Sequence, residues 1–257
     1  SHPKVESIMY ALRNTPCLTG CDFCNQVFDA HKGLKTFFGF DSYRTYNNQS
    51  LQEDAVKAAL KGKSLLAIFP TGGGKSITFQ VPALMSGELV KGLTVVISPL
   101  QSLMKDQVDN LRKYSITDAV TINGLLDPIE RSESFERVEN GTASILYISP
   151  ESLRSKSIER LLLGRKIVRF VIDEAHCFSS WGQDFRVDYL YIGDYIRQLQ
   201  LKKGLVQPIP VSCFTATAKQ EVIEDISIYF KEKLNIQLEL FRSNSYRTNL
   251  EYQVFQK

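Results

Sequence analysis

A glycine-rich segment that ends in lysine and serine has the clearest chemistry in this sequence. Residues 70–76 read Pro-Thr-Gly-Gly-Gly-Lys-Ser and lie between an apolar run and an amphipathic stretch. Glycines allow backbone N–H groups to turn toward phosphate oxygens, and the N-terminus of a helix adds its positive dipole. At these positions a lysine reaches the β- and γ-phosphates and a serine hydroxyl binds Mg²⁺. The residues expected to hold a nucleoside triphosphate are Thr71, Gly72, Gly73, Gly74, Lys75 and Ser76.

A pair of carboxylates, Asp173 and Glu174, follows a second apolar run. A carboxylate at the carboxyl end of a neighbouring parallel strand is placed to meet the Mg²⁺ of the nucleotide, so Asp173 and Ser76 are the expected Mg²⁺ ligands. Glu174 is expected to orient or deprotonate the attacking water, as general-base chemistry requires. His176 is expected to link this site to the rest of the fold. The sequence therefore predicts an ATPase site whose catalytic residues are Lys75, Asp173, Glu174 and His176.

Three of the five cysteines are clustered near the start of the chain, and a histidine follows them. Three thiolates and an imidazole make up the ligand set of a Cys3His zinc site. One hypothesis is therefore a zinc ion bound by Cys17, Cys21, Cys24 and His31. The same Cys-x3-Cys-x2-Cys spacing resembles the cluster motif of radical S-adenosylmethionine enzymes, although a phosphate loop follows here where that family has a barrel. Thiols without a ligand in a helical segment are the third interpretation.

The composition is that of a globular protein. Hydrophobic residues make up 43% of the chain and charged residues 23%, which excludes a chain that is mainly disordered. The net charge of +3 means that an anionic partner must be bound by a local patch. No apolar run approaches the ~18 residues of a membrane helix, and the chain begins Ser-His-Pro-Lys without an apolar signal segment. We therefore expect an intracellular protein with no membrane partner.

Short apolar runs rich in β-branched residues alternate with longer amphipathic stretches along most of the chain. The expected strands are residues 65–69, 93–97, 118–122, 144–148, 167–172 and 210–214. The expected helices are residues 4–13, 51–61, 75–85, 100–114, 128–140, 151–163, 187–201 and 219–230. Strands that are apolar throughout and separated by helices indicate a parallel sheet covered on both faces. The predicted fold is an α/β three-layer sandwich with a mostly parallel sheet, followed by a strand-like tail at residues 236–257.

The phosphate loop together with Asp-Glu-Ala-His at residues 173–176 resembles helicases of the DEAD/DEAH-like superfamily. Neighbouring blocks sharpen this to the RecQ family of DNA helicases. Residues 98–108 are similar to motif Ia of that family, 147–153 to motif Ib, 215–218 to motif III, and 176–186 to its aromatic-rich loop. The resemblance covers about residues 37–230. It implies a RecA-like P-loop NTPase lobe that uses ATP and Mg²⁺ and binds single-stranded or partly duplex DNA.

The resemblance also implies which residues bind DNA or couple DNA binding to hydrolysis. They are Ser98, Pro99, Gln101, Lys105, Gln107, Ser149, Pro150, Trp181, Phe185, Arg186, Thr215 and Thr217. Trp181 and Phe185 are expected to stack on bases, and the other interpretation of Trp181 is a core residue. Arg186 and the polar groups of motifs Ia and Ib are expected to contact phosphates, which requires no readout of base sequence.

The segment that holds adenine departs from the RecQ pattern. In that family a Phe-Gly-aromatic segment is followed by an aromatic-Arg pair and then by a glutamine. Residues 38–40 fit the first part, and Arg44 fits the second, so Arg44 is expected to lie at the ATP site. Gln52 matches the glutamine if about five residues have been inserted before it, and Gln49 is the alternative.

The resemblance divides the chain into three parts. They are a helical, cysteine-containing appendage at residues 1–36, a RecA-like helicase ATP-binding domain at 37–240, and a linker at 241–257 toward a second RecA-like lobe. Because helicases of this type take an arginine finger from the second lobe, one lobe alone is expected to be nearly inactive. Two alternatives stay open: the motor lobe of a double-strand DNA translocase or restriction subunit, and a nucleotide-dependent scaffold without catalysis. The expected location is the cytoplasm, with nucleoid association in a bacterium.

Overall fold

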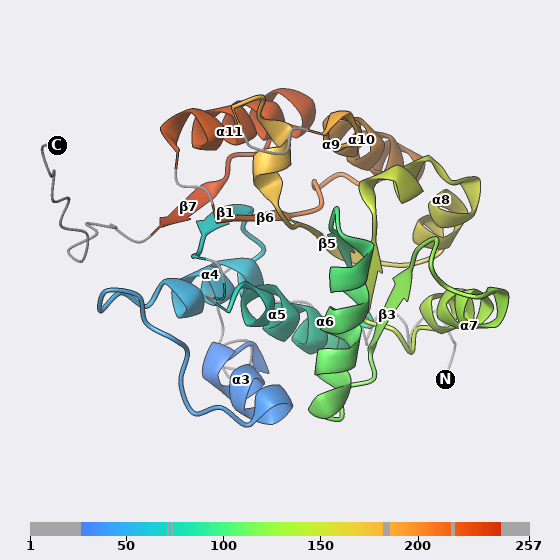
Figure 1. Ribbon diagram of the computed structural model, residues 1–257, viewed down its shortest axis with the longest axis horizontal. Coiled ribbons are helices and arrows are strands. Elements are labelled where there is room, and N and C mark those ends of the chain that lie inside the picture. The colour runs from blue at the N-terminus through green and yellow to red at the C-terminus, as the bar shows by residue number, and fades with distance from the viewer. Residues whose placement is uncertain (1–26, 71, 73, 182–185, 217–218, 243–257) are drawn as a thin grey trace, which may run out of the picture.

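The computed structural model describes residues 27–242, except for 71, 73, 182–185 and 217–218. The described part is built around a sheet of seven strands in the order β3-β4-β2-β5-β6-β1-β7, and all of its pairings are parallel (Figure 1). The strands are β1 (Leu65–Ile68), β2 (Leu93–Ile97), β3 (Ala119–Ile122), β4 (Ile145–Ile148), β5 (Ile167–Ile172), β6 (Val211–Thr215) and β7 (Glu239–Arg242). All the carboxyl ends of the strands therefore lie on one side of the molecule, and all the amino ends on the other.

Helices cover both faces of the sheet (Figure 1). One face is covered by α3 (Ala30–Phe38), α4 (Leu51–Leu60), α5 (Lys75–Val90) and α6 (Gln101–Lys113). The other face is covered by α7 (Pro128–Glu139), α8 (Lys156–Leu163), α10 (Ile192–Lys202) and α11 (Gln220–Leu234). Three short turns, η1 (Pro150–Arg154), η2 (Ala175–Phe178) and α9 (Val187–Leu190), follow the carboxyl ends of β4 and β5. The predicted three-layer α/β sandwich is confirmed.

Strand β1 shows why the strands are apolar throughout. Leu66 and Ile68 face the core under α7, α8, α10 and α11, whereas Leu65 and Ala67 face the core under α3 to α6. Successive side chains of a strand point to opposite faces, and here each face is covered by helices. A strand buried on both sides has no polar positions to alternate with its apolar ones.

The six strands expected from the sequence all appear, with ends within one residue of those expected. Two expected helices are divided in the structure. Residues 151–163 form η1 and α8, separated by the extended Ser155, and residues 187–201 form α9 and α10. Helix α5 continues five residues beyond its expected end, past the internal Pro82. The helix expected at residues 4–13 lies outside the described residues.

One helix and one strand span the predicted domain boundaries. The boundary between residues 36 and 37 falls within α3, which packs on α5 through Leu34 and Phe38. The two helices approach closely at Gly33, where an added side chain would lie 2.4 Å from the sulfur of Met85. The boundary between residues 240 and 241 falls within β7, which extends the sheet beside β1.

The strands that carry the phosphate loop and the carboxylates are not adjacent. The sequence suggested neighbouring strands, but β6 lies between β1, which precedes Lys75, and β5, which precedes Asp173. The reason is the order of strands in the sheet, which local sequence does not encode. As a result, Thr215 at the end of β6 lies between the two segments.

Candidate active site

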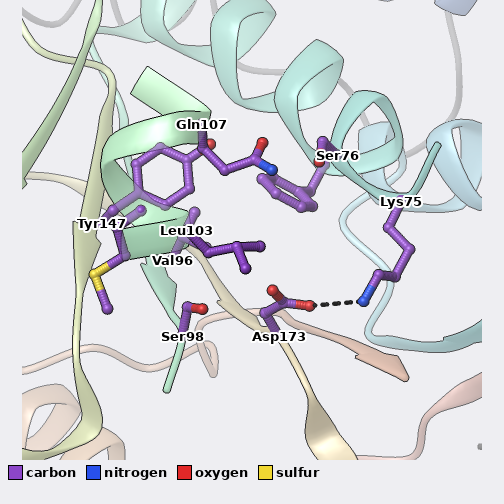
Figure 2. Close-up of a pocket in the computed structure, with 10 residues that line it drawn as sticks. Lys75, Ser76, Val96, Ser98, Leu103, Gln107, Tyr147 and Asp173 are labelled. Carbon is purple, nitrogen blue, oxygen red and sulfur yellow. Dashed lines mark hydrogen bonds and ion pairs between the residues drawn. The ribbon is translucent and has the colours of Figure 1, made fainter. Parts of the chain in front are cut away.

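Lys75 lies between two carboxylates at the carboxyl end of the sheet. Its Nζ is 3.3 Å from Oδ1 of Asp173 and 2.9 Å from Oε1 of Glu174. Figure 2 shows Lys75 extending from the start of α5 toward Asp173, beside a pocket that Ser76 also lines. The three charged side chains keep between 16% and 26% of their surface exposed. The predicted phosphate-binding lysine and the predicted Mg²⁺ and water-activating carboxylates are therefore brought together, within reach of solvent.

Burial is the largest influence on the pKa of both Lys75 and Asp173. It lowers the pKa of the Lys75 ammonium, but the two carboxylates outweigh it, and the pKa of Lys75 is raised overall. Burial raises the pKa of the Asp173 carboxyl, and Lys75 offsets this only partly because Glu174 adds a second negative charge. The site therefore holds more negative charge than its lysine neutralises, which suits the binding of a divalent cation.

Glu174 is connected through a histidine to the next strand. Its backbone is in the left-handed region, with φ of 50°, which is uncommon for a residue other than glycine. Its Oε2 lies 3.3 Å from Nδ1 of His176, and the same nitrogen lies 3.3 Å from Oγ1 of Thr215. His176 thus contacts both Glu174 and Thr215, at the carboxyl ends of β5 and β6. Thr217 lies outside the described residues.

Gln52 holds the phosphate loop from the side of α4. The side chain is 2% exposed. Its Oε1 accepts a hydrogen bond from the backbone N–H of Arg44 at 2.9 Å, and its Nε2 donates to the carbonyl of Gly74 at 2.8 Å. The Arg44 guanidinium donates to the carbonyl of Gly72 at 3.3 Å. Gly74 has φ of 74°, and an added side chain would lie 2.8 Å from Nε2 of Gln52, so the loop requires glycine here.

The segment before Gln52, where the resemblance implies an insertion, contains a tight turn. Tyr46 and Gln49 exchange two backbone hydrogen bonds, of 2.9 and 2.8 Å. The two residues between them, Asn47 and Asn48, both have left-handed backbone conformations, as in the two-residue turns of β-hairpins. The turn returns the chain to the start of α4, so that Gln52 reaches the phosphate loop. Of the two candidate glutamines, Gln52 contacts the loop.

The residues of motifs Ia and Ib lie at the carboxyl ends of β2 and β4. Ser98 and Ser149 are buried there, and Oγ of Ser149 lies 3.0 Å from Oγ of Ser152. Pro150 is also buried, at the start of η1. On α6, Lys105 is exposed and Gln101 is half-buried. These positions lie on the same side of the molecule as Lys75.

Gln107 points inward rather than toward solvent. Its Oε1 accepts a hydrogen bond of 3.1 Å from Nε2 of Gln80 on α5. The same Nε2 lies 3.1 Å from the hydroxyl of Tyr147 on β4. The structure therefore places Gln107 in a contact between helices, although the resemblance grouped it with DNA contacts.

The aromatic-rich loop begins with an exposed tryptophan. Trp181 is 67% exposed, so it is not a core residue. Its backbone N–H donates to Oγ of the buried Ser179 at 3.2 Å, and that hydroxyl donates to Asp225 of α11 at 2.5 Å. At the other end of the loop, Arg186 donates to the carbonyl of Pro99 in motif Ia at 3.4 Å. Phe185 lies outside the described residues.

A sequence model of the DEAD/DEAH box helicases matches residues 49–226. This stretch is more than half of the chain, and it contains the phosphate loop, the paired carboxylates and motifs Ia, Ib and III. The chain belongs to the DEAD/DEAH box helicases.

Within the DEAD/DEAH box helicases, this chain is similar to RecQ-type DNA helicases. It is 40% identical over 193 residues to the probable ATP-dependent DNA helicase RecS of Bacillus subtilis (strain 168), covering 75% of this chain and 35% of RecS. It is 41% identical over 207 residues to the ATP-dependent DNA helicase RecQ of the same organism, covering 80% and 32% of the two chains. Against the ATP-dependent helicase SGS1 of Saccharomyces cerevisiae it is 38% identical over 213 residues, covering 80% and 14%. The RecQ resemblance is confirmed, and the chain spans about a third or less of these relatives.

Solved helicase structures share the fold of this DEAD/DEAH box domain. The helicase MrfA bound to DNA and AMPPNP has a TM-score of 0.63 at 20% identity, and the match covers 84% of this chain and 29% of MrfA. A hypothetical ATP-dependent RNA helicase from Sulfolobus tokodaii has a TM-score of 0.55 at 18% identity, covering 84% and 56%. The predicted RecA-like helicase fold is confirmed, and the RecQ-type relatives do not favour the translocase or scaffold alternatives.

The structure also shows contacts in this helicase domain that the sequence did not indicate. The hydroxyl of Tyr189 donates to the carbonyl of Asp173 at 2.8 Å. Arg154 of η1 pairs with Asp188 at 3.1 Å and lies over the ring of Tyr191, 4.6 Å from its centre. These contacts connect motif Ib and the carboxylates with the segment after the aromatic-rich loop. The partners are more than 15 residues apart in sequence, so no local spacing could reveal them.

The zinc hypothesis is not supported by the described residues. Nε2 of His31 lies 2.8 Å from Oε1 of Glu53, and its ring packs edge-on against Tyr43. The three candidate cysteines, Cys17, Cys21 and Cys24, lie outside the described residues. In the part of the chain that the structure describes, no group of three or more His, Cys, Asp and Glu side chains could hold a metal ion. In the same part, no helix is long and apolar enough to cross a bilayer.

Proposed function

We propose that this chain is the first motor lobe of a RecQ-like DNA helicase, which binds ATP with Mg²⁺ and couples its hydrolysis to movement on single-stranded DNA and to unwinding in the complete protein. The observation that carries the proposal is the contact of Lys75 with both Asp173 and Glu174 at the end of the phosphate loop. A lysine for phosphate, a carboxylate for the metal ion and a carboxylate for water are the groups that phosphoryl transfer requires.

The shape of the loop supports ATP as the ligand. Gly72 and Gly74 both have φ of 74°, a conformation found in backbone turns that bind anions. Helix α5 begins directly after the loop, so its N-terminal dipole favours a phosphate there. Ser76 and Asp173 line one pocket with Lys75 and would hold Mg²⁺, which when bound neutralises charge on the phosphate oxygens.

The chain's own residues suggest an exchange of partners on ATP binding. Lys75 would leave its two carboxylates for the phosphate oxygens, which frees Asp173 and Glu174 for their roles. Glu174, held by His176, would orient the attacking water and accept its proton. Because His176 also contacts Thr215, a change in the position of Glu174 would alter the contacts at the end of β6.

The DNA would lie along the carboxyl end of the sheet. Lys105, Gln101 and the η1 turn are suited to phosphates, which any sequence offers. Trp181 is suited to stacking on an unpaired base, and Arg186 adds a charge close to motif Ia. A strand bound here would contact the same side of the molecule that binds ATP.

A second RecA-like lobe would complete the ATP site with an arginine finger, which is worth roughly 10³–10⁵ in rate in related enzymes. This chain alone would then bind ATP and hydrolyse it slowly. In a bacterium such a protein would act at the nucleoid.

The test is the Glu174→Gln substitution in the complete protein that contains this lobe, with ATP hydrolysis measured with and without an oligo(dT) strand. We expect Glu174→Gln to abolish DNA-stimulated hydrolysis while ATP affinity is kept, and Glu136→Gln on the exposed surface of α7 to change neither. Unchanged hydrolysis in Glu174→Gln would contradict an enzymatic role for this site. Strong DNA-stimulated hydrolysis by the 257-residue chain as a monomer would contradict the need for a second lobe.

A further inference from the structure

Three polar side chains, two of them buried and one half-buried, form a hydrogen-bonded group between α5, α6 and β4, which we call the Gln80 triad. It consists of Gln80, Gln107 and Tyr147. Nε2 of Gln80 donates to Oε1 of Gln107 and to the hydroxyl of Tyr147, both at 3.1 Å. Gln80 is 4% exposed and Tyr147 is 1% exposed, while Gln107 is half-buried. One amide therefore joins two helices and a strand inside the core.

Each member of the triad belongs to an element that carries part of the proposed site. Gln80 lies four residues after Ser76 on α5, and residues at this spacing share one face of a helix. Gln107 is on α6, which begins two residues after Pro99 of motif Ia. Tyr147 lies two residues before Ser149 of motif Ib. The triad thus connects the helix that starts at the phosphate loop to both segments proposed to bind DNA.

The triad adjoins the ATP site directly. Gln107 and Tyr147 line the same pocket as Lys75, Ser76 and Asp173, and Figure 2 shows all five around it. Gln80 is part of α5, so a shift of the start of this helix would move Gln80 directly. A change in the position of α5 on ATP binding would therefore act on these hydrogen bonds first.

Hydrogen bonds make this contact sensitive to position. The triad is surrounded by apolar side chains, among them Phe79, Val96 and Met104. Buried polar groups without partners are costly, so Gln80 strongly favours arrangements of α5 and α6 that keep both of its bonds. Apolar contacts of the same size would tolerate sliding, since dispersion is not directional. Burial raises the pKa of Tyr147, which keeps its hydroxyl neutral and able to hydrogen-bond.

We propose that Gln80, Gln107 and Tyr147 are positioning residues that make ATP binding and DNA binding on this lobe depend on each other. This inference rests on the proposed function. It also gives Gln107 a different role from the DNA contact that the family resemblance implies, because its carbonyl oxygen is engaged by Gln80 inside the lobe.

The test measures coupling with the 257-residue chain. A fluorescent, non-hydrolysable ATP analogue is titrated with Mg²⁺, with and without saturating oligo(dT), and the oligo(dT) is titrated with and without the analogue. Coupling must be the same in both directions. In the wild type we expect one ligand to change the affinity for the other by about 5-fold or more, the lower range of allosteric coupling. In Tyr147→Phe and Gln107→Leu we expect this factor, which is a ratio of two affinities for the same ligand, to fall close to 1.

Two matched variants separate positioning from a general loss of structure. Gln107→Glu keeps an oxygen that can accept from Gln80, so we expect it to keep the wild-type coupling. Asn110→Ala alters an exposed residue on the same helix and should also keep it. Melting temperatures of all variants show whether the lobe is folded, and Tyr147→Phe removes only one hydroxyl.

The outcomes distinguish this inference from the proposed function. If the wild type binds neither the analogue nor oligo(dT), the proposed function fails and the inference fails with it. If the wild type binds both without coupling, or if Tyr147→Phe and Gln107→Leu keep the coupling, the inference is overturned and the proposed function stands. Equal loss of coupling in Asn110→Ala would also overturn it, because the effect would not be specific to the triad.

Discussion

Buried and half-buried cationic side chains at the two ends of the sheet have different partners. At the carboxyl end, Lys75 pairs with the side chains of Asp173 and Glu174. At the amino end, Arg169 is buried within β5. It donates to the carbonyl of Ala59 in the last turn of α4, to the carbonyl of Lys63 after that helix, and to a serine hydroxyl, at 2.8–3.0 Å. Arg165 likewise donates to carbonyls in the last turn of α7 and just after α5, and Lys203 to the last two carbonyls of α8. Lys75 therefore pairs with carboxylates, whereas Arg169, Arg165 and Lys203 donate mainly to backbone carbonyls at or near the carboxyl ends of helices.

This difference in partners gives the cations at the two ends of the sheet different roles. Cations at the C-terminus of a helix interact favourably with its dipole and satisfy its last carbonyls, and those carbonyls are fixed by the backbone. Burial lowers the pKa of Arg169 to about 10, so its charge persists at neutral pH. The partners of Lys75 are carboxylate side chains, and the phosphate oxygens of a ligand can compete with them for the Lys75 ammonium. The amino end therefore stabilises the fold, and the carboxyl end keeps its charges available to a ligand.

The sharpest test of this comparison is removal of the exchangeable cation. We expect Lys75→Met to lower the affinity for ATP by about 100- to 1000-fold, or roughly 2.7–4 kcal/mol, the range seen when one preorganised electrostatic contact is lost. The melting temperature should change little. Fluorescence titration with an ATP analogue measures the affinity. Lys91→Met, an exposed lysine just beyond the other end of α5, is the matched control, and an equal loss there would refute a specific role for Lys75.

At the amino end of the sheet, we expect loss of a cation to lower the melting temperature and to leave ATP affinity unchanged. Arg169→Met leaves two carbonyls and a hydroxyl without their donor, and each buried unsatisfied group costs about 1–3 kcal/mol. We expect the free energy of unfolding to fall by about 3 kcal/mol, which lowers the melting temperature by roughly 6–12 °C in a chain of this size. ATP affinity of the folded variant should be unchanged. If the exposed Arg160→Met lowers the melting temperature as much, burial of Arg169 is not what stabilises the lobe.

Two exposed apolar residues extend the comparison to the surface. Trp181 lies at the carboxyl end and is 67% exposed, and Val206 lies near the amino end, before β6, and is 96% exposed. Stacking of a base on an aromatic ring contributes about 1–3 kcal/mol, so we expect Trp181→Ala to weaken oligo(dT) binding by roughly 5- to 150-fold without a change in melting temperature. Val206→Ala should leave oligo(dT) binding unchanged. Fluorescence anisotropy measures both, and similar losses would show that exposure alone explains the effect.

The fold could be predicted largely from the sequence, because strands buried on both faces leave a clear signal. The run from Leu65 to Ile68 is apolar at every position and a glycine-rich segment follows it, so the strand was predicted with its end only one residue too late. The position of β6 between β1 and β5 could not be predicted, since sheet order depends on contacts between distant segments. The break at Ser155 was missed because residues 151–163 keep an amphipathic pattern across it.

The site was predictable where chemistry is encoded locally. The spacing within residues 70–76 and 173–176 identified Lys75, Asp173 and Glu174, and the structure brings them together. Arg169 gave no such signal, because the carbonyls that it binds lie more than 100 residues away in sequence. Gln80 was also missed, although a polar residue one turn after Ser76 within the apolar run from Phe79 to Met85 could have marked it.

The smallest expected effect distinguishes the two ends by their response to pH. Burial, only partly offset by Lys75, raises the pKa of the Asp173 carboxyl above its unfolded value. A carboxyl of this kind favours the folded state below its unfolded pKa, and that contribution is lost as the pH rises through the folded pKa. Asp173→Asn has no charge to bury, so we expect it to melt at a slightly higher temperature than the wild type at pH 7, with a difference that shrinks toward pH 4.

The loss of stability caused by Arg169→Met should be similar at both pH values, because the arginine stays charged throughout. Circular dichroism melting curves measure both series, with Asp106→Asn at an exposed position of α6 as the control. A difference in melting temperature between Asp173→Asn and the wild type that does not depend on pH would mean that burial of the Asp173 charge does not destabilise the fold. The two ends of the sheet would then differ only in the groups that pair with their cations.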